Sequence, residues 1–84
     1  MGTIRYWAAA KDAAGVAEEP FAEETLAEAL AAAVRRRPGD ERFARVLGLS
    51  SYLVDGDPVG TRPHESVRLP ADAVVEVLPP FAGG

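Results

Sequence analysis

Residues 74–84 read Val-Val-Glu-Val-Leu-Pro-Pro-Phe-Ala-Gly-Gly, and this stretch decides how the rest of the chain is interpreted. The Val-rich run at 74–78 predicts a β-strand, because β-branched residues favour strands. Proline has no backbone donor, so the hydrogen bonds of the sheet should stop near Pro79. Glycine lacks a side chain, so Gly83-Gly84 can thread a channel that is closed to other residues. We therefore expect a globular domain over residues 1–78 and a flexible tail over residues 79–84. A frayed terminus without a role is the alternative.

The composition limits the classes of function. The 84 residues suffice for one small domain, and a hydrophobic content of 48% is enough to build a core. The net charge of -4 argues against a phosphate-binding surface, so we expect no nucleic-acid partner. No apolar run approaches the roughly 20 residues of a membrane span, and residues 1–6 do not resemble a signal peptide. We expect no membrane contact and, by default, a cytoplasmic location. The absence of cysteine excludes disulfides and thiolate metal ligands.

The first 22 residues predict two strands. Residues 3–8 are β-branched and aromatic and alternate in character, which predicts the first strand. Residues 9–15 predict a loop or one helical turn that ends at Gly15. Residues 16–22 predict a short second strand, and its Glu18, Glu19 and Pro20 suit the edge of a sheet.

A helix follows these strands. Thr25 and Glu28 fit a capping box, in which each side chain satisfies an exposed backbone donor of the other residue. The arginines at 35–37 lie at the negative end of the helix dipole, so we expect a solvated helix terminus rather than a binding patch. Pro38-Gly39 ends the helix. Its apolar stripe has helical spacing and consists of Leu26, Ala29, Leu30, Ala33 and Val34.

The second half predicts shorter elements. Residues 40–47 predict a short helix with Phe43, Val46 and Leu47 facing inward, and residues 51–54 predict a third strand. Asp55-Gly56 is a strong signal for a tight turn. Residues 67–69 predict a short strand or a turn. The order of elements predicts an α+β fold, a mixed sheet with one main helix across a face.

Residues that often carry chemistry do not combine into a catalytic or metal site. His64 is the only histidine, so no histidine-based metal cluster is expected. Ser50 and Ser51 lack the glycines of a nucleophile elbow, so we expect His64 to be an ordinary solvated histidine. Asp55-Gly56-Asp57 lacks the remaining ligands of a calcium loop. We therefore expect that the chain is not an enzyme by itself.

Six motifs are informative when taken together: Tyr6-Trp7-Ala8, Lys11-Asp12, Gly15, Thr25-Leu26-Ala27-Glu28, Leu53-Val54-Asp55-Gly56 and Pro79-Pro80-Phe81-Ala82-Gly83-Gly84. Together they resemble the ubiquitin-like sulfur carriers of the MoaD/ThiS family, and within it the small subunit of molybdopterin synthase. The end of the chain is the most specific motif, because thiamine-pathway carriers share Gly-Gly but typically lack Pro-Pro. Two positions depart from the family: Lys11 stands where arginine is commoner, and Ala71-Asp72-Ala73 stands where an acidic Gly-Asp turn is preferred.

The resemblance implies a fold, a function and a set of partners. The implied fold is the β-grasp, with four to five strands and the first and last strands parallel at the centre. An E1-like enzyme similar to MoeB would use ATP to adenylate Gly84, and a sulfurtransferase would convert it to a thiocarboxylate. A MoaE-like large subunit would then pass the sulfur to the pterin precursor in molybdenum cofactor biosynthesis. The chain itself would bind no cofactor. Residues 79–84 reach about 20 Å at roughly 3.3 Å each, enough to enter a partner's active site.

The body of the domain must also dock on these partners. If the alternate residues Val75 and Val77 face the helix, Val74 and Leu78 lie on the open face of the sheet, near Trp7 or Tyr6. An exposed apolar patch commonly marks an interface, although scattered surface hydrophobic residues are the alternative.

The resemblance adds Lys11 to the expected partner contacts. Two other functions remain open. One is a carrier that supplies sulfur for cysteine, thiamine or tRNA thiolation. The other is a protein modifier that is conjugated to lysines through Gly84.

Overall fold

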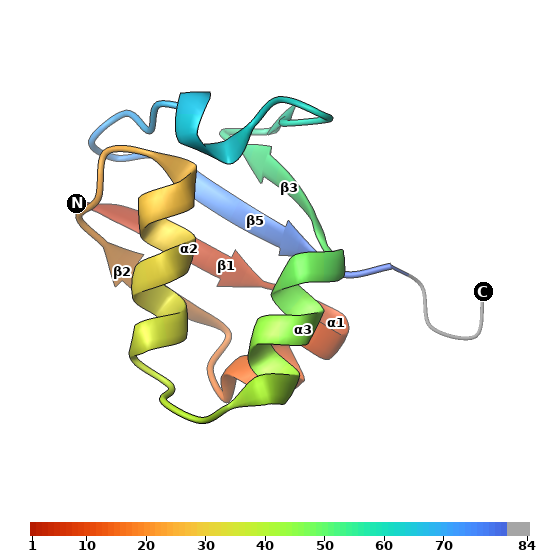
Figure 1. Ribbon diagram of the computed structural model, residues 1–84. Coiled ribbons are helices and arrows are strands. Elements are labelled where there is room, and N and C mark those ends of the chain that lie inside the picture. Colours follow the sequence, from red (N-terminus) through yellow and green to blue (C-terminus); the bar gives the residue numbers. More distant parts are fainter. Residues whose placement is uncertain (81–84) are drawn as a thin grey trace.

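The computed structural model describes residues 1–80, which form a five-stranded sheet, three α-helices and one 3-10 helix. Figure 1 shows these elements along the chain. None of the helices in this part of the chain has the length and apolarity needed to cross a membrane. The elements are β1 (Gly2–Tyr6), α1 (Ala8–Ala14), β2 (Glu18–Phe21), α2 (Leu26–Arg35), α3 (Glu41–Leu49), β3 (Ser51–Val54), β4 (Asp57–Pro58), η1 (His64–Ser66) and β5 (Val74–Leu78).

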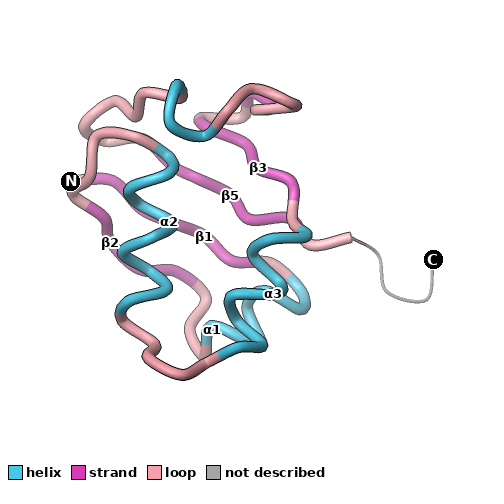
Figure 2. The backbone as a smooth tube through the Cα atoms, viewed as in Figure 1, coloured by secondary structure: helices cyan, strands magenta, loops and turns pink. Residues whose placement is uncertain are grey.

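The sheet has the strand order β2-β1-β5-β3-β4. β1 and β5 pair in parallel, with Ile4 opposite Val75, and the other neighbours pair antiparallel. β5 therefore lies at the centre, with a hydrogen-bonded strand on each side. Figures 1 and 2 show that α2 and α3 both cover the same face of this sheet. The predicted β-grasp fold is confirmed.

Local sequence signals fix the boundaries of several elements. The Thr25 hydroxyl accepts a hydrogen bond from the Glu28 amide at 3.2 Å and donates one to the Glu28 carboxylate at 3.0 Å, as the capping box predicts. Asp40 caps α3 by accepting from the Phe43 amide at 3.0 Å. The turn between β3 and β4 places Asp55 at φ 49° and Gly56 at φ 84°, the two positive angles that a type I′ hairpin turn requires.

The core lies between the sheet and the two covering helices. Ile4, Val75 and Val77 on the sheet, and Leu26 and Phe43 on the helices, are at most 1% exposed. The alternation predicted for β5 is thereby confirmed. Because the central strand is apolar on this face and hydrogen-bonded along both edges, it belongs, with β1, to the firmly held centre of the domain.

The first strand is shorter than the sequence predicts, and the segment after it is more helical. β1 ends at Tyr6 rather than at residue 8, and α1 occupies residues that were expected to form a loop or a single turn. The Trp7 carbonyl accepts hydrogen bonds from the amides of Ala10 and Lys11, which starts the helix. Alanine is the best helix former, and the run Ala8-Ala9-Ala10 outweighs the β-propensity of the preceding aromatic residues. Gly15 ends α1 in the left-handed region at φ 81°.

The expectation of a solvated arginine run is wrong for Arg37. Its side chain is 14% exposed and lies 2.8 Å from the Glu19 carboxylate, which is itself 13% exposed. Its guanidinium also donates to the carbonyls of Ala33 at 2.9 Å and Ala14 at 3.2 Å, and it stacks over the Phe43 ring at 4.3 Å. The arginine turns inward because its planar fork satisfies three acceptors and one aromatic face at once.

Tyr6 was one of two residues considered as neighbours of Val74 and Leu78 on the open face, but it lies on the opposite, core-facing side of the sheet. It is 1% exposed and faces the core, where its hydroxyl donates to Glu19 and its ring meets Phe43 edge to face at 5.7 Å. Burial, and then the hydrogen bond to the Glu19 carboxylate, raise the pKa of Tyr6 above its ordinary value. We call Tyr6, Glu19, Arg37 and Phe43 the Arg37 cluster. This cluster joins β1, β2, α3 and the ends of α1 and α2.

Candidate functional site

The parallel strands β1 and β5 finish at the same end of the sheet, which we call the exit end. The Trp7 amide donates to the Val77 carbonyl at 3.2 Å, and Leu78 pairs with Ser51 at the start of β3. β5 ends at Leu78 and Pro79 follows, as expected from the missing donor of proline. The chain thus leaves its central strand between the start of α1 and the start of β3, the side on which α3 also ends (Figure 1).

The predicted tail lies only partly within the described residues. Pro79 is half-buried and Pro80 is exposed. The predictions for Phe81, Ala82 and Gly83, and for Gly84 as the reacting residue, lie outside the described residues.

The open face of the sheet has a mixed character. Val74 and Leu78 lie on it and are half-buried, while Val75 and Val77 face the core. Glu76 lies between Val74 and Leu78 on the open face, and its register partner on β1 is Arg5. Arg5 in turn lies 3.4 Å from the carboxylate of Glu18 on β2. The predicted apolar patch is therefore crossed at its middle by a row of charged side chains.

Trp7 joins this face to the exit end. Its side chain is 45% exposed, and its indole N–H donates to the Glu76 carboxylate at 3.0 Å. The bond links the residue that precedes α1 to the middle of β5. It therefore fixes the orientation of an exposed aromatic ring beside the point where the chain leaves the sheet.

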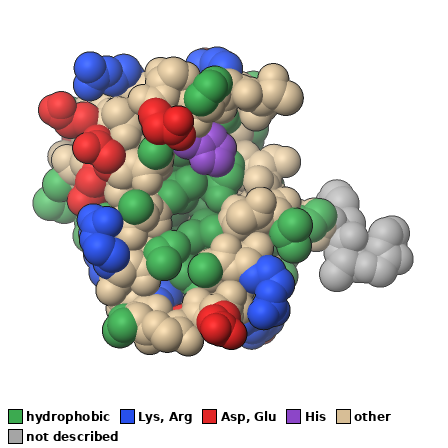
Figure 3. Space-filling view, viewed as in Figure 1, with side chains coloured by type: hydrophobic (Ala, Val, Ile, Leu, Met, Phe, Trp, Pro, Cys, Tyr) green, Lys and Arg blue, Asp and Glu red, His purple; other side chains and the backbone are tan. Residues whose placement is uncertain are grey.

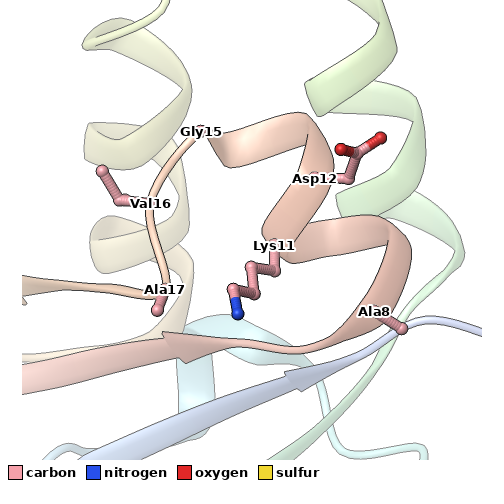
Figure 4. A pocket seen from close by; sticks show the side chains of 6 residues that line it. All are labelled: Ala8, Lys11, Asp12, Gly15, Val16 and Ala17. Atoms are coloured by element: carbon pink, nitrogen blue, oxygen red, sulfur yellow. The ribbon is translucent and has the colours of Figure 1, made fainter.

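Lys11 lies in a shallow hollow beside the exit end. The hollow has a volume of about 420 Å³ and is bounded by α1 and by the loop that leads to β2. Figure 4 shows the Lys11 side chain reaching from α1 across the end of β1 toward Ala17. Its neighbour Asp12 points away and forms an ion pair with Arg42 of α3 at 2.9 Å. Lys11 is exposed, and no ion pair or side-chain hydrogen bond engages its ammonium within residues 1–80.

A second hollow lies on the opposite, helix-covered side of the molecule. Figure 3 shows apolar side chains at the surface between α2 and α3, with the imidazole at their rim. The hollow has a volume of about 230 Å³, and Leu30, Val34, Leu47, Tyr52 and His64 line it. The His64 ring packs edge to face on Tyr52 at 5.1 Å, and burial raises the pKa of Tyr52 to about 12.

The structure brings three of the four predicted partner contacts to the exit end and leaves Val74 at the other end of β5. Trp7 and Leu78 lie next to each other at the exit end, Lys11 lies one helical turn further on, and Val74 lies at the far end of β5. In the described part of the chain, no cluster of three or more acidic, histidine or cysteine side chains could hold a metal ion.

Two residues of this region were not anticipated from the sequence. Glu76 was given no role from the sequence, because its bond to Trp7 depends on the parallel register of β1 and β5. Arg37 donates a hydrogen bond to the Ala14 carbonyl at the end of α1, but in the sequence it is one of three consecutive arginines. The register could have been inferred from the β-grasp topology, whereas nothing local distinguishes Arg37 from its neighbours.

Comparisons with known proteins agree with this geometry. The ThiS family model matches residues 4–84, nearly the whole chain. Comparison with curated proteins gives no match.

Solved structures give the same fold. Small archaeal modifier protein 1 from Methanosarcina acetivorans is similar with a TM-score of 0.75 at 21% identity, over 99% of this chain and 95% of that one. Small archaeal modifier protein 1 from Haloferax volcanii is similar with a TM-score of 0.74 at 22% identity, over 99% and 98% of the two chains.

Proposed function

The chain belongs to the ThiS family of ubiquitin-like sulfur carriers, and from this premise we propose that it is the small, sulfur-carrying subunit of molybdopterin synthase. In this proposal Gly84 is the C-terminal residue of the mature protein and carries the sulfur as a thiocarboxylate. The chain supplies no catalytic side chain and binds no cofactor. The activating enzyme and the large synthase subunit perform the chemistry.

The reaction at Gly84 has two steps. A carboxylate is anionic at neutral pH and is a poor electrophile, so it must be activated first. An E1-like enzyme lets the carboxylate attack the α-phosphate of ATP, which forms an acyl adenylate and releases pyrophosphate. Bisulfide, supplied through a sulfurtransferase, then attacks the carbonyl carbon, a C–S bond forms, the bond to the phosphate oxygen breaks and AMP leaves, so that one sulfur replaces one carboxylate oxygen.

The observation that carries the proposal is the origin of the tail. Residues 79–84 follow directly from β5, the central strand, which pairs with β1 on one side and β3 on the other. A segment of about 20 Å at full extension thus starts from the buried, doubly paired centre of the sheet. The body can remain docked on a partner while the last residues enter that partner's active site.

The open face and Trp7 supply the docking surface in this proposal. Aromatic residues are enriched in protein interfaces, and Trp7 offers a half-exposed ring whose orientation is held by Glu76. Val74 and Leu78 add half-buried apolar area on the same face. Because the tail leaves beside this face, the activating enzyme and the large subunit must use overlapping surfaces and compete.

The test is intact-mass analysis of the full chain after incubation with ATP, an E1-like enzyme and a sulfur source. The expected product has one sulfur in place of one oxygen, located on the C-terminal peptide. A chain without Gly84 is the matched control, since it retains the body and loses only the proposed reacting residue. Absence of the sulfur product from the complete chain under conditions that thiolate a known carrier contradicts the proposal.

A second candidate is a ubiquitin-like modifier, favoured by the likeness to the two solved small archaeal modifier proteins. The same activated Gly84 would then be transferred to lysines of other proteins. Adding the large synthase subunit with the pterin precursor separates the two candidates. A carrier loses its sulfur and returns to the carboxylate, whereas a modifier accumulates in isopeptide-linked conjugates.

A further inference from the structure

Lys11 is the only lysine in the sequence, which otherwise carries its positive side chains as arginine. This difference is chemical as well as numerical. A lysine ammonium can lose its proton and become a nucleophilic amine, whereas the arginine guanidinium remains protonated in proteins. The chain therefore offers two primary amines to an electrophile, the Lys11 side chain and the N-terminus.

The fold places these two amines at opposite ends of the sheet. The Lys11 amide is bonded to the Trp7 carbonyl at 3.2 Å, and the Trp7 amide is bonded to the Val77 carbonyl at 3.2 Å. Lys11 thus lies one helical turn, about 5.4 Å of rise, after Trp7, the residue whose amide is bonded to the end of β5. The amine of Met1 lies at the far end of β1, about 16 Å away over five strand residues, and is 3.5 Å from the Asp72 carboxylate.

The surroundings of Lys11 leave its amine accessible. The side chain lies across a hollow of about 420 Å³ that is open to solvent and contains a single carboxylate, that of Asp12 (Figure 4). The carboxylate of Asp12 is engaged by Arg42 at 2.9 Å. Residues 79–84 span up to about 20 Å at full extension, several times the rise of the one helical turn between Lys11 and Trp7, whose amide is bonded to Val77.

From these observations we infer that Lys11 is an acceptor site for acyl transfer from an activated C-terminal glycine. The inference rests on the proposed function in one respect, the activation of Gly84 by adenylation. The neutral Lys11 amine attacks the carbonyl carbon, a C–N bond forms, the bond from that carbon to the phosphate oxygen breaks, and AMP leaves. The second amine proton passes to water, and no oxidation or reduction occurs. The glycine comes from the same chain or from a second copy.

The test supplies the activation chemically. The full chain is prepared with a C-terminal thioester of 2-mercaptoethanesulfonate on Gly84 and held at mildly alkaline pH, at low and at high protein concentration. Transfer within one chain gives a monomer that lacks one water relative to the free acid. Transfer between copies gives a dimer whose yield rises with concentration. Both products must contain a Lys11–Gly84 cross-linked peptide on digestion, and either one supports the inference.

Two variants control the result. Lys11→Arg keeps the positive charge and should lower the yield of amide product about tenfold or more, because a guanidinium does not act as the nucleophile. Lys11→Arg combined with Arg68→Lys moves the single lysine to a side chain that is 79% exposed, next to the start of α2 and away from the exit end. This double variant should not restore the within-chain product. Circular dichroism checks that both variants are folded.

The inference is overturned if the parent thioester only hydrolyses, if Lys11→Arg gives an undiminished yield, or if the relocated lysine reacts as well as Lys11. A separate sample of the thioester treated with bisulfide forms the thiocarboxylate directly. If the enzymes do not thiolate the chain but the chemically prepared thioester still reacts with Lys11, only the carrier function is contradicted. The carrier function and the role of Lys11 can therefore fail independently.

Discussion

Replacing Arg37 by methionine tests how the fold supports the exit end. The substitution keeps an unbranched apolar stem that can still lie against Phe43, and it removes the guanidinium. The loss includes the ion pair to Glu19 at 2.8 Å and the hydrogen bonds to the carbonyls of Ala33 and Ala14. Glu19 keeps two partners, the Tyr6 hydroxyl and Arg36 at 3.4 Å.

The expected cost follows from these contacts. Removing one member of a buried ion pair typically costs 3–5 kcal/mol, because the other charge is left without compensation. Here both side chains retain about one-seventh of their exposure, and Arg36 offers partial replacement, so we expect a loss of about 2–4 kcal/mol. Arg36→Met is the matched control: the side chain is 42% exposed, and its loss should cost no more than about 1 kcal/mol.

Urea denaturation of the two variants measures both costs. Hydrogen exchange adds a local readout, because Arg37 bonds to the carbonyl of Ala14 at the end of α1. The Gly15 amide, which donates to Lys11, should exchange faster in Arg37→Met than global destabilisation explains. Equal and small losses for the two variants would falsify the assignment of Arg37 as the buried partner.

Four further outcomes are expected. Deleting Gly84 should abolish thiolation, measured by intact mass, while the melting temperature stays within a degree or so, because one terminal residue contributes little to a folded core. Leu30→Ala should cost about 2–4 kcal/mol in chemical denaturation; a value below about 0.5 kcal/mol would remove Leu30 from the core, in which it is 8% exposed. Leu78→Glu should weaken binding to both the activating enzyme and the large subunit while the protein stays folded by circular dichroism, and unchanged affinity for both would place docking elsewhere. The free energy of unfolding should fall as pH rises above about 10, because Tyr6 and Tyr52 ionise at that pH only in the unfolded chain. In the folded protein the pKa of each is raised, that of Tyr52 to about 12. Tyr52→Phe should reduce this loss of stability at alkaline pH, as measured by urea titrations at several pH values.

Elements with strong local signals were predicted closely from the sequence. β3 and β5 have the predicted bounds, α2 begins at the predicted capping box, and the Asp55-Gly56 turn forms the predicted hairpin. In each case the deciding interaction joins residues no more than four positions apart, or repeats with the period of the element. Such signals are legible in one sequence because they do not depend on the rest of the fold.

The errors arise where distant residues decide the outcome. Arg37 belongs to a run that satisfies the rules for a solvated helix end, yet Glu19, on another strand, draws it inward. The Trp7–Glu76 bond spans 69 positions of sequence and depends on the parallel register of β1 and β5. Helix α1 was underestimated because the preceding aromatic residues suggested a longer strand, whereas the alanine run after Trp7 turned the chain.

Glu76 bears on the proposal that the open face docks both the activating enzyme and the large subunit. With an apolar residue at position 76, Val74, Leu78, Leu53 and Trp7 would form a continuous apolar surface, and such surfaces promote self-association. A carboxylate in the middle adds a desolvation cost to any contact that does not offer it a partner. In the free protein that partner is the Trp7 indole, with Arg5 at the register position opposite. A docking protein that presents its own donor to Glu76 can therefore bury the face, whereas a second, unmatched surface cannot do so without leaving the charge unpaired.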